Sequence, residues 1–457
     1  MLRSQTRPRL PRPRSTARTT IRLGRSTPHR SPVQFGAWVA RTARAAAALL
    51  APLLFAGCGT LLRNPTPPEL AATAAVPDMP EVRSWPGRRD TAMQDDLIVS
   101  FSQESREEFP VGPHGQVRYP VLLLSGGGAN GAFGAGLLSG WSRRGDRPAF
   151  KIVTGVSTGA LIAPFAFLGP DYDAALRDLY TTTSTRDIFA RGSLLATLSQ
   201  VLAGEALADT GPLAAMIARH VDETLLDRVA AAHRNGRRLY IGTADLDSQR
   251  FVVWNMGRIA ASTHPDRLAL FRKVMLASAS IPVAFPPVFF DVEVNGQRFD
   301  EMHVDGGVGA MVFFTAGVFS TDTARRSAGG PAGYDDLFVI HNGQLRPPAT
   351  SPTPRTLRGI SRRVLEASGR SAVVGDLFRI YAVALEERAR FRWVTIGTGV
   401  SIEGDEFFDP AVMARLYEQG LATGLDGRWS TRPPGIDDPP WERPPTGDGS
   451  AASQRLQ

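Results

Sequence analysis

A serine in a glycine-flanked turn is the first feature of this chain that could take part in catalysis. Ser157 lies in Gly155-Val156-Ser157-Thr158-Gly159, after the short predicted strand Phe150–Val153 and before a segment typical of a helix. A strand-to-helix turn of this kind exposes a nucleophilic serine, and the small flanking residues leave room for the sharp bend. The helix that follows directs N–H groups at developing negative charge. We interpret Ser157 as a nucleophile, although the motif alone also fits a glycine-rich turn with an incidental serine.

A glycine-rich loop precedes the serine motif. Ser125–Ala132 contains Gly126, Gly127, Gly128 and Gly131, directly after the apolar run Tyr119–Leu124. The spacing also matches a dinucleotide-binding loop, but that fold needs an acidic residue at the end of the second strand, where this chain has the serine turn. Consecutive glycines let backbone N–H groups converge without Cβ obstruction. The loop therefore predicts an oxyanion hole.

A serine nucleophile needs a group that accepts its proton. Asp305 ends a predicted strand, Met302-His303-Val304-Asp305, and Gly306-Gly307 turns the chain immediately after it, which predicts a carboxylate held on a tight turn. An ordinary Asp-Gly turn is the alternative interpretation. Among the seven histidines, His341 at a predicted strand end is the best candidate for a Ser-His-Asp triad.

Strands and helices alternate between about residues 96 and 425. Repeated strand–helix units predict an α/β fold with a mainly parallel sheet flanked by helices, whose active site lies at the carboxyl ends of the strands. Asn295-Gly296 predicts a two-residue hairpin turn. The predicted strands are 119–124, 150–153, 238–241, 250–254, 288–294, 297–300, 337–340 and 393–396, and the predicted helices are 158–168, 211–233, 266–279, 357–388 and 409–422.

Together, the glycine-rich loop, the serine turn and the Asp-Gly-Gly turn resemble the patatin-like phospholipase family. The small-residue segment Ala277–Pro287 adds to this resemblance, which covers about residues 119–310. It implies a three-layer α/β/α fold and a Ser–Asp dyad without His. By resemblance, Ser157 is the nucleophile, Asp305 is the base, Gly126, Gly127, Gly128 and Gly131 frame the oxyanion hole, and Gly155, Gly159, Gly306 and Gly307 are the motif glycines. Asn130 departs from the family, in which many members carry Arg or Lys at that position.

These features predict hydrolysis of lipid esters, of the phospholipase A or lysophospholipase type. A normal Asp pKa is poorly matched to serine, so we expect a partly desolvated site. We expect no metal and no cofactor, because the chain has no Cys/His cluster. Apolar residues between Ile188 and Leu202 could form a lid over an acyl chain, or could be plain core.

The N-terminus predicts export. A basic leader runs into the eleven-residue apolar segment Ala45–Phe55, which is the length of a signal-peptide core. Ala56-Gly57-Cys58 then resembles a bacterial lipobox, which implies palmitate-type lipidation of Cys58, and Gly59 favours the outer membrane by the same resemblance. Phe55 departs from the usual Leu. A non-lipidated secretory signal, or a buried free cysteine, is the alternative.

Charge and composition divide the chain into four regions. Residues 1–57 hold eleven arginines and no acid, so the remainder of the chain, within a total of +8, carries −3. No basic stripe is left for nucleic acid. We predict a signal region (1–57), an extended tether (58–95), an acyl hydrolase domain (96–425) and a Pro-rich disordered tail (426–457). Two other functions stay open: an inactive envelope lipoprotein used for binding, and a Ser-His-Asp esterase. The sequence predicts no oligomeric state.

Overall fold

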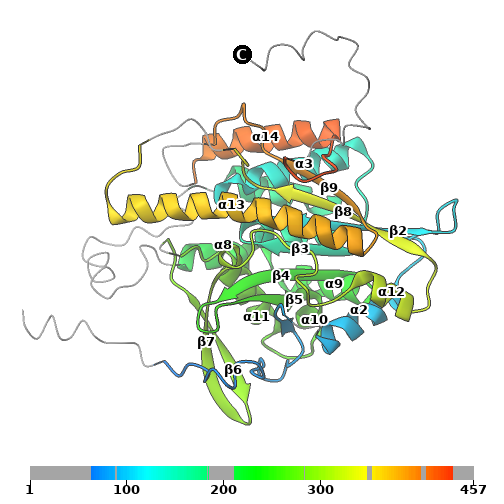
Figure 1. Ribbon diagram of the computed structural model, residues 1–457, viewed down its shortest axis with the longest axis horizontal. Coiled ribbons are helices and arrows are strands. Elements are labelled where there is room, and N and C mark those ends of the chain that lie inside the picture. Colours follow the sequence, from blue (N-terminus) through cyan, green and yellow to red (C-terminus); the bar gives the residue numbers. More distant parts are fainter. Residues whose placement is uncertain are drawn as a thin grey trace, which may run out of the picture. The chain divides into compact units, whose positions relative to one another are not determined.

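A nine-stranded sheet organises the described part of the computed structural model (Figure 1). The structure describes residues 63–87, 90–182, 184, 210–282, 284–346, 352–402 and 408–435. The strands follow the order β1-β5-β4-β3-β2-β8-β9, and β7 pairs with both β4 and β6. Their bounds are β1 (Arg83–Ser84), β2 (Val117–Leu124), β3 (Ile152–Val156), β4 (Arg238–Asp245), β5 (Arg250–Asn255), β6 (Val288–Val294), β7 (Gln297–Asp305), β8 (Gly333–His341) and β9 (Arg390–Thr395).

Five neighbouring strands of this sheet, β4, β3, β2, β8 and β9, run parallel. Alternate side chains of β2 enter two different cores, because successive residues of a strand point to opposite faces. Leu122 and Leu124 pack with helices α3, α4 and α14, whereas Val121 and Leu123 pack with α2 and α13. The predicted three-layer α/β architecture with a mainly parallel sheet is therefore confirmed.

The helices match most of the predicted spans. One difference is the predicted helix 211–233, which is two helices because Asp222 caps the second by accepting a hydrogen bond from the Leu225 N–H. The helices are α2 (Thr91–Gln103), α3 (Gly131–Arg144), α4 (Thr158–Leu168), α5 (Asp173–Thr181), α8 (Gly211–His220), α9 (Glu223–Arg234), α10 (Met256–Ala261), α11 (Arg267–Ser278), α12 (Thr321–Ser327), α13 (Leu357–Glu386) and α14 (Pro410–Asp426).

The predicted hairpin around Asn295-Gly296 joins β6 to β7, with both turn residues at positive φ. Strand β7 is longer than predicted and continues to Asp305. The extension has a physical cause, because the last three residues of β7, from His303 to Asp305, pair with β4, which matches Thr243 with Asp305.

The segment before the domain is not the extended tether that the sequence predicts. From Arg63 onward it packs against the sheet, and Arg83 pairs with Glu301 in a buried ion pair. Ala74, Val76, Met79 and Val82 are buried, and β1 adds to the edge of β5. The prolines suggested a solvated linker, but the apolar residues between them complete the core at this edge.

The C-terminal boundary also lies later than predicted. Trp429 packs on Trp141 and Phe338, and Ser430 forms a β-bridge with Trp393. The candidate lid between Ile188 and Leu202 and residues 436–457 lie outside the described residues, as does Cys58.

None of the helices in the described ranges is both long enough and apolar enough to cross a membrane.

Candidate active site

Ser157 occupies a strained turn between β3 and α4. Its backbone has φ 56° and ψ −125°, a conformation that is unfavourable for a residue with a side chain. Glycines on both sides make this turn possible. A Cβ added to Gly155 would lie 2.4 Å from the Gly159 carbonyl oxygen, and one added to Gly159 would lie 2.4 Å from the Leu124 oxygen. This close packing is the reason for glycine two residues before and two residues after the serine.

Asp305 is the last residue of β7 and is buried beside the serine. Its Oδ1 accepts a hydrogen bond of 2.7 Å from the Gly307 N–H. Burial raises the pKa of Asp305 from about 3.8 to about 6, against smaller lowering effects from the Ser157 hydroxyl and the Gly307 amide. The Asp305 Oδ2 is buried and accepts no hydrogen bond from the residues that the structure describes. The Ser157 hydroxyl is thus near the carboxylate without a short hydrogen bond, as is frequent in catalytic pairs without substrate.

Strand β4 brings these two residues together although 148 positions of sequence separate them. Gly242 of β4 pairs with Val156, the residue before the serine, and Thr243 pairs with Asp305. A further link comes from Ser278 at the end of α11, whose hydroxyl accepts from the Ser157 N–H and donates to the Gly242 carbonyl. Ser278 belongs to the small-residue segment that the sequence singled out, so its position here gives that segment a physical role.

The four glycines of the glycine-rich loop differ in whether their N–H groups are already hydrogen-bonded. Gly126 donates its N–H to the Met311 carbonyl (2.9 Å), and Gly131 donates into the first helical turn. The N–H groups of Gly127 and Gly128 donate to no group among the residues the structure describes. Among the four predicted oxyanion-hole glycines, Gly126 and Gly131 therefore have N–H groups with protein acceptors, and Gly127 and Gly128 remain candidates for such a role.

Steric contacts explain the two outer glycines. An added Cβ on Gly126 would lie 3.2 Å from the Ser157 Cβ, and one on Gly131 would lie 2.1 Å from the Thr158 hydroxyl. Gly127 is equally constrained, because an added Cβ there would lie 1.9 Å from the Asn342 carbonyl oxygen. The loop therefore approaches the serine turn and β8 more closely than any other residue type would allow.

Asp376 on α13 supports the loop from outside and was missed in the sequence. Its Oδ2 accepts from the Met311 and Val312 N–H groups at 2.7 and 3.3 Å. Burial raises its pKa. Since the Met311 carbonyl in turn holds Gly126, Asp376 fixes the position of the oxyanion loop through one intermediate residue. No sequence motif marks Asp376, which lies more than sixty positions beyond the aspartate turn.

An apolar pocket opens beside Ser157. Gly128, Thr158 and Tyr180 line it near the serine, and the remainder of its wall is Leu161, Leu179, Leu213, Met216, Ala279, Ile281, Phe285, Phe408 and Met413. Its volume of about 30 Å³ holds one or two water molecules. Such a wall suits hydrocarbon, and a long chain would need these side chains to move.

The structure gives no support to His341 as a triad member. Its Nδ1 is 2.9 Å from the Thr395 hydroxyl on β9, which is on the far side of β8 from the serine turn. Burial lowers the pKa of His341 to about 4. In the described residues, no hydrogen bond connects it with Ser157 or Asp305.

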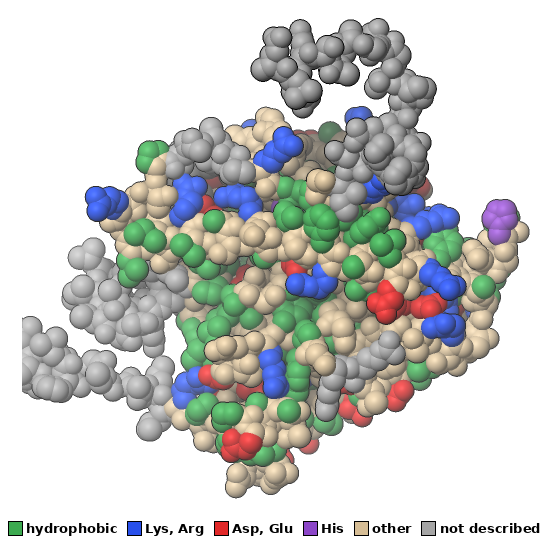
Figure 2. Space-filling model, in the orientation of Figure 1, with side chains coloured by type: hydrophobic (Ala, Val, Ile, Leu, Met, Phe, Trp, Pro, Cys, Tyr) green, Lys and Arg blue, Asp and Glu red, His purple; other side chains and the backbone are tan. Residues whose placement is uncertain are grey.

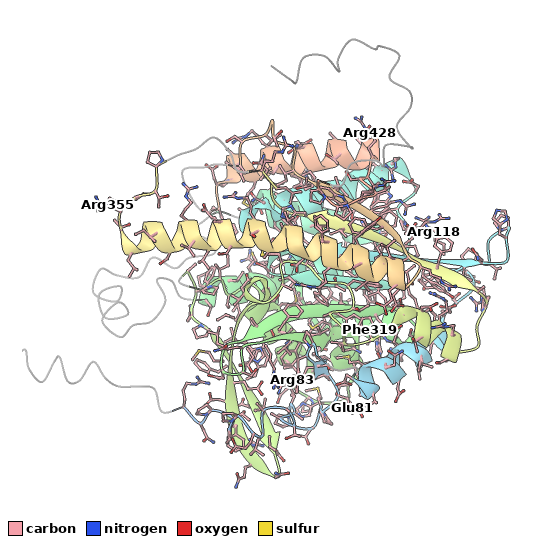
Figure 3. The ribbon with its side chains drawn as sticks, in the orientation of Figure 1. Glu81, Arg83, Arg118, Phe319, Arg355 and Arg428 are labelled. Carbon is pink, nitrogen blue, oxygen red and sulfur yellow. The ribbon has the colours of Figure 1, made fainter. Side chains whose placement is uncertain are left out.

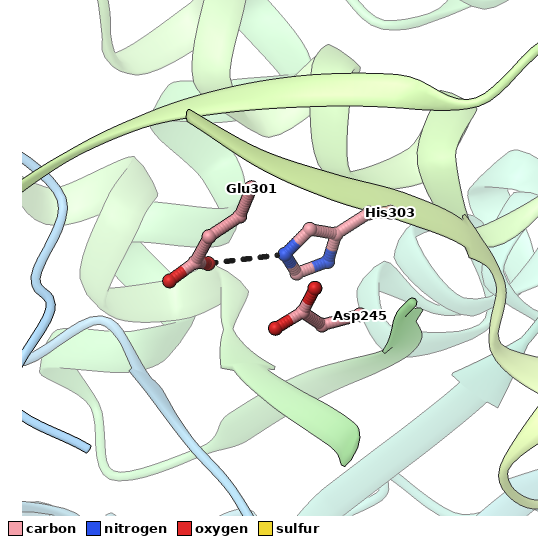
Figure 4. Close-up of side chains that lie close together, drawn as sticks. All are labelled: Asp245, Glu301 and His303. Carbon is pink, nitrogen blue, oxygen red and sulfur yellow. Dashed lines mark hydrogen bonds and ion pairs between the residues drawn. The ribbon is translucent and has the colours of Figure 1, made fainter. Parts of the chain in front are cut away.

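A second buried cluster, formed by Asp245, Glu301 and His303, has ligand atoms within 4.8 Å of one another (Figure 4). Its groups already have partners. Glu301 pairs with Arg83, and His303 bonds Thr243 and Glu301. Burial alone would raise the pKa of Glu301, but His303 and Arg83 lower it to about 2. The Arg83 guanidinium supplies the positive charge that a metal would supply. We therefore interpret the cluster as a structural ion-pair network that attaches the N-terminal segment to β7.

The family model for patatin-like phospholipase matches residues 122–317. Among solved structures, VipD from Legionella pneumophila shares 12% identity over 70% of each chain, with a TM-score of 0.34. ExoU of Pseudomonas aeruginosa, solved with SpcU, shares 17% identity over 67% of this chain and 51% of its own, with a TM-score of 0.26. These two likenesses are too weak to support a conclusion. No curated protein sequence matches the chain.

Proposed function

Residues 122–317 form a patatin-like phospholipase domain, and from this premise we propose that the chain hydrolyses carboxylic esters of lipids with a Ser157–Asp305 dyad. One observation carries the proposal. A serine in a strained strand-to-helix turn lies next to a buried carboxylate with a raised pKa. The glycine-rich loop that contacts this turn has two N–H groups, those of Gly127 and Gly128, that donate to no group in the described ranges. These are the nucleophile, base and oxyanion donors that acyl transfer requires.

The reaction has two steps. Asp305 takes the proton of the Ser157 hydroxyl while the serine oxygen attacks the ester carbonyl carbon. The N–H groups of Gly127 and Gly128 stabilise the resulting oxyanion. The ester C–O bond then breaks, and the leaving alkoxide takes the proton from Asp305. In the second step Asp305 takes a proton from water, the hydroxide attacks the acyl carbon, and Ser157 leaves with that proton.

The electrostatics of the site suit this role. Ser157 and Asp305 are 5% and 6% exposed, which fits the desolvated site expected from the sequence. A carboxylate whose pKa is about 6 is a stronger base than an ordinary aspartate and is still ionised at neutral pH. Each oxyanion donor typically contributes about 3 kcal/mol of transition-state stabilisation.

The apolar pocket supports a fatty acyl group as the part of the substrate that binds beside the serine. The pocket residues would contact the acyl chain and not the alcohol part of the ester, so they select for neither a phospholipid nor a lysolipid.

Activity and labelling test this proposal together. The protein should release fatty acid from phosphatidylcholine vesicles and react with a fluorophosphonate probe, which reports an activated serine whatever the substrate. Ser157→Ala should remove both signals. Labelling that persists in Ser157→Ala would place the nucleophile elsewhere, and absence of labelling in the unaltered protein would favour an inactive binding protein.

We also propose that Cys58 is lipidated and holds the enzyme on the cell envelope, at the outer membrane. Cys58 lies five positions before Arg63, which is the first residue that the structure describes and which pairs with Asp300 of the domain. This link spans at most about 18 Å, so an acyl anchor would keep the domain close to the bilayer. Radiolabelled palmitate should label the unaltered protein and not Cys58→Ser, and equal labelling of both would exclude this anchor.

A further inference from the structure

Helix α13 exposes an apolar face over its full length. From Val373 onward its inward face is buried against the sheet, at Val373, Leu377 and Ile380, whereas none of the described residues from Leu357 to Ala372 is buried. With about 3.6 residues per turn, the opposite face consists of residues that are all exposed and that include no charged side chain. They are Leu357, Ile360, Val364, Ala367, Ser371, Gly375, Phe378, Ala382 and Leu385.

This pattern is the reverse of what a surface helix normally shows. The solvent face of such a helix is usually polar or charged. Here five large side chains on that face are exposed, by 84% (Leu357), 51% (Ile360), 56% (Val364), 39% (Phe378) and 63% (Leu385). A contiguous exposed apolar patch usually marks an interaction surface.

The segment that forms α13 carries an excess of positive charge. From Arg355 to Arg379 the chain has six arginines and two acids, although the chain beyond residue 57 is net negative. Figure 2 shows hydrophobic and basic side chains along the band that α13 occupies in Figure 1. Arg355 lies at the outer end of the helix (Figure 3). An apolar stripe on an arginine-rich helix is the pattern of a helix that lies in a membrane interface.

The helix also passes beside the active site. An added Cβ on Gly369 would lie 3.7 Å from the Met311 Sδ, and the carbonyl of Met311 holds Gly126 of the oxyanion loop. In Figure 1 the N-terminal half of α13 lies at the end of the sheet where β2 and β3 run into their catalytic turns. A surface in contact with Leu357, Ile360 and Val364 would therefore adjoin the active-site end of the sheet.

We propose that the exposed face of α13 docks on an anionic phospholipid surface and holds the active-site end of the sheet against it. The proposal rests on the proposed function, because lipid substrate resides in such a surface. A second copy of this chain is a poorer occupant, since it would oppose one arginine-rich segment with another. Each arginine near an anionic membrane adds attraction that salt weakens.

Vesicle binding by the full chain carrying Cys58→Ser tests this without an acyl anchor. The probe is co-sedimentation with vesicles of phosphatidylcholine mixed with phosphatidylglycerol. Ile360→Glu and Val364→Glu should each weaken binding by about tenfold or more, because each replaces a buried apolar contact with a charge. Val99→Glu is the matched control: Val99 on α2 is 47% exposed and should bind like the parent.

Two further measurements separate the possible outcomes. Arg370→Gln should weaken binding about fivefold on anionic vesicles and hardly at all on pure phosphatidylcholine. Hydrolysis of a soluble short-chain ester should be unchanged in the α13 variants, which shows that they fold. Unchanged vesicle binding in Ile360→Glu and Val364→Glu would overturn the proposal.

The same experiments keep docking and catalysis distinct. A parent protein that binds vesicles through α13 but hydrolyses no ester would refute the proposed function and leave the docking surface standing. A parent dimer that the α13 variants convert to monomers, with vesicle binding unaffected, would assign the face to a second copy and overturn membrane docking.

Discussion

Replacement of Asp305 by Asn should inactivate the protein and stabilise it at neutral pH. Burial raises the pKa of Asp305 from about 3.8 to about 6, so the folded protein must ionise this group at a cost that the unfolded chain avoids. The two values differ by about two pKa units, or about 3 kcal/mol. Asparagine mimics the neutral acid. Its oxygen can accept from the Gly307 N–H, and its NH₂ group can donate to the Ser157 hydroxyl.

The sign of the effect depends on pH. Below the unfolded pKa the acid is protonated in both states, and Asp305 costs no stability. As pH rises from about 4 to about 6 the unfolded chain releases the proton first, so the stability of the parent protein falls. Above the folded pKa the cost is complete. Asp305→Asn should therefore gain up to about 3 kcal/mol at about pH 8 and almost nothing at about pH 4.

Urea denaturation of both proteins at the two pH values measures this gain. In parallel, ester hydrolysis by the parent should decline as pH falls through about 6, and Asp305→Asn should lose at least about a hundredfold in kcat. Asp335→Asn is the matched control. Asp335 is also buried with its pKa raised to about 6, but it lies near the amino end of β8, so activity should be retained. A less stable Asp305→Asn at the higher pH, or one that keeps its activity, would refute the reasoning.

Three further predictions concern the surroundings of the dyad. His341→Ala should keep fluorophosphonate labelling and most activity, and inactivity of a folded variant would restore the triad hypothesis. Asp376→Ala should lower kcat by about tenfold or more with little change in KM, because two buried amides lose their acceptor. Asp376→Asn retains an acceptor and should recover most of that loss, whereas a merely structural role would affect only the melting temperature. Gly127→Ala should abolish activity and destabilise the fold, since its Cβ would lie 1.9 Å from the Asn342 oxygen, and a stable, active variant would show that the loop is not tightly held.

Local patterns explain why the central part of the fold was predictable. The apolar run of β2 is typical of a strand buried on both faces, and the alternation of strands with helices along the chain indicated a mainly parallel sheet. Asn295 and Gly296 adopt the positive φ values that their turn requires, and this preference belongs to the residues themselves. The N-terminal segment was predicted wrongly because proline content indicates only a locally extended backbone. It gives no information on the distant residues of the core in which Val76, Met79 and Val82 are buried.

The sequence by itself determined the chemistry: a serine that glycines hold in a strained turn, a carboxylate at a strand end and a loop with bare amides. Only the tertiary structure decided which groups meet. Pairing of β4 with both β3 and β7 sets Asp305 beside Ser157, and the Gly126 N–H donates to the Met311 carbonyl, so the proposed oxyanion donors are Gly127 and Gly128. The apolar residues of α13 were equally visible in the sequence, yet packing alone selected which face is buried. Backbone preference acts between neighbours along the chain, whereas hydrogen-bond partners and burial depend on residues that folding brings from far away.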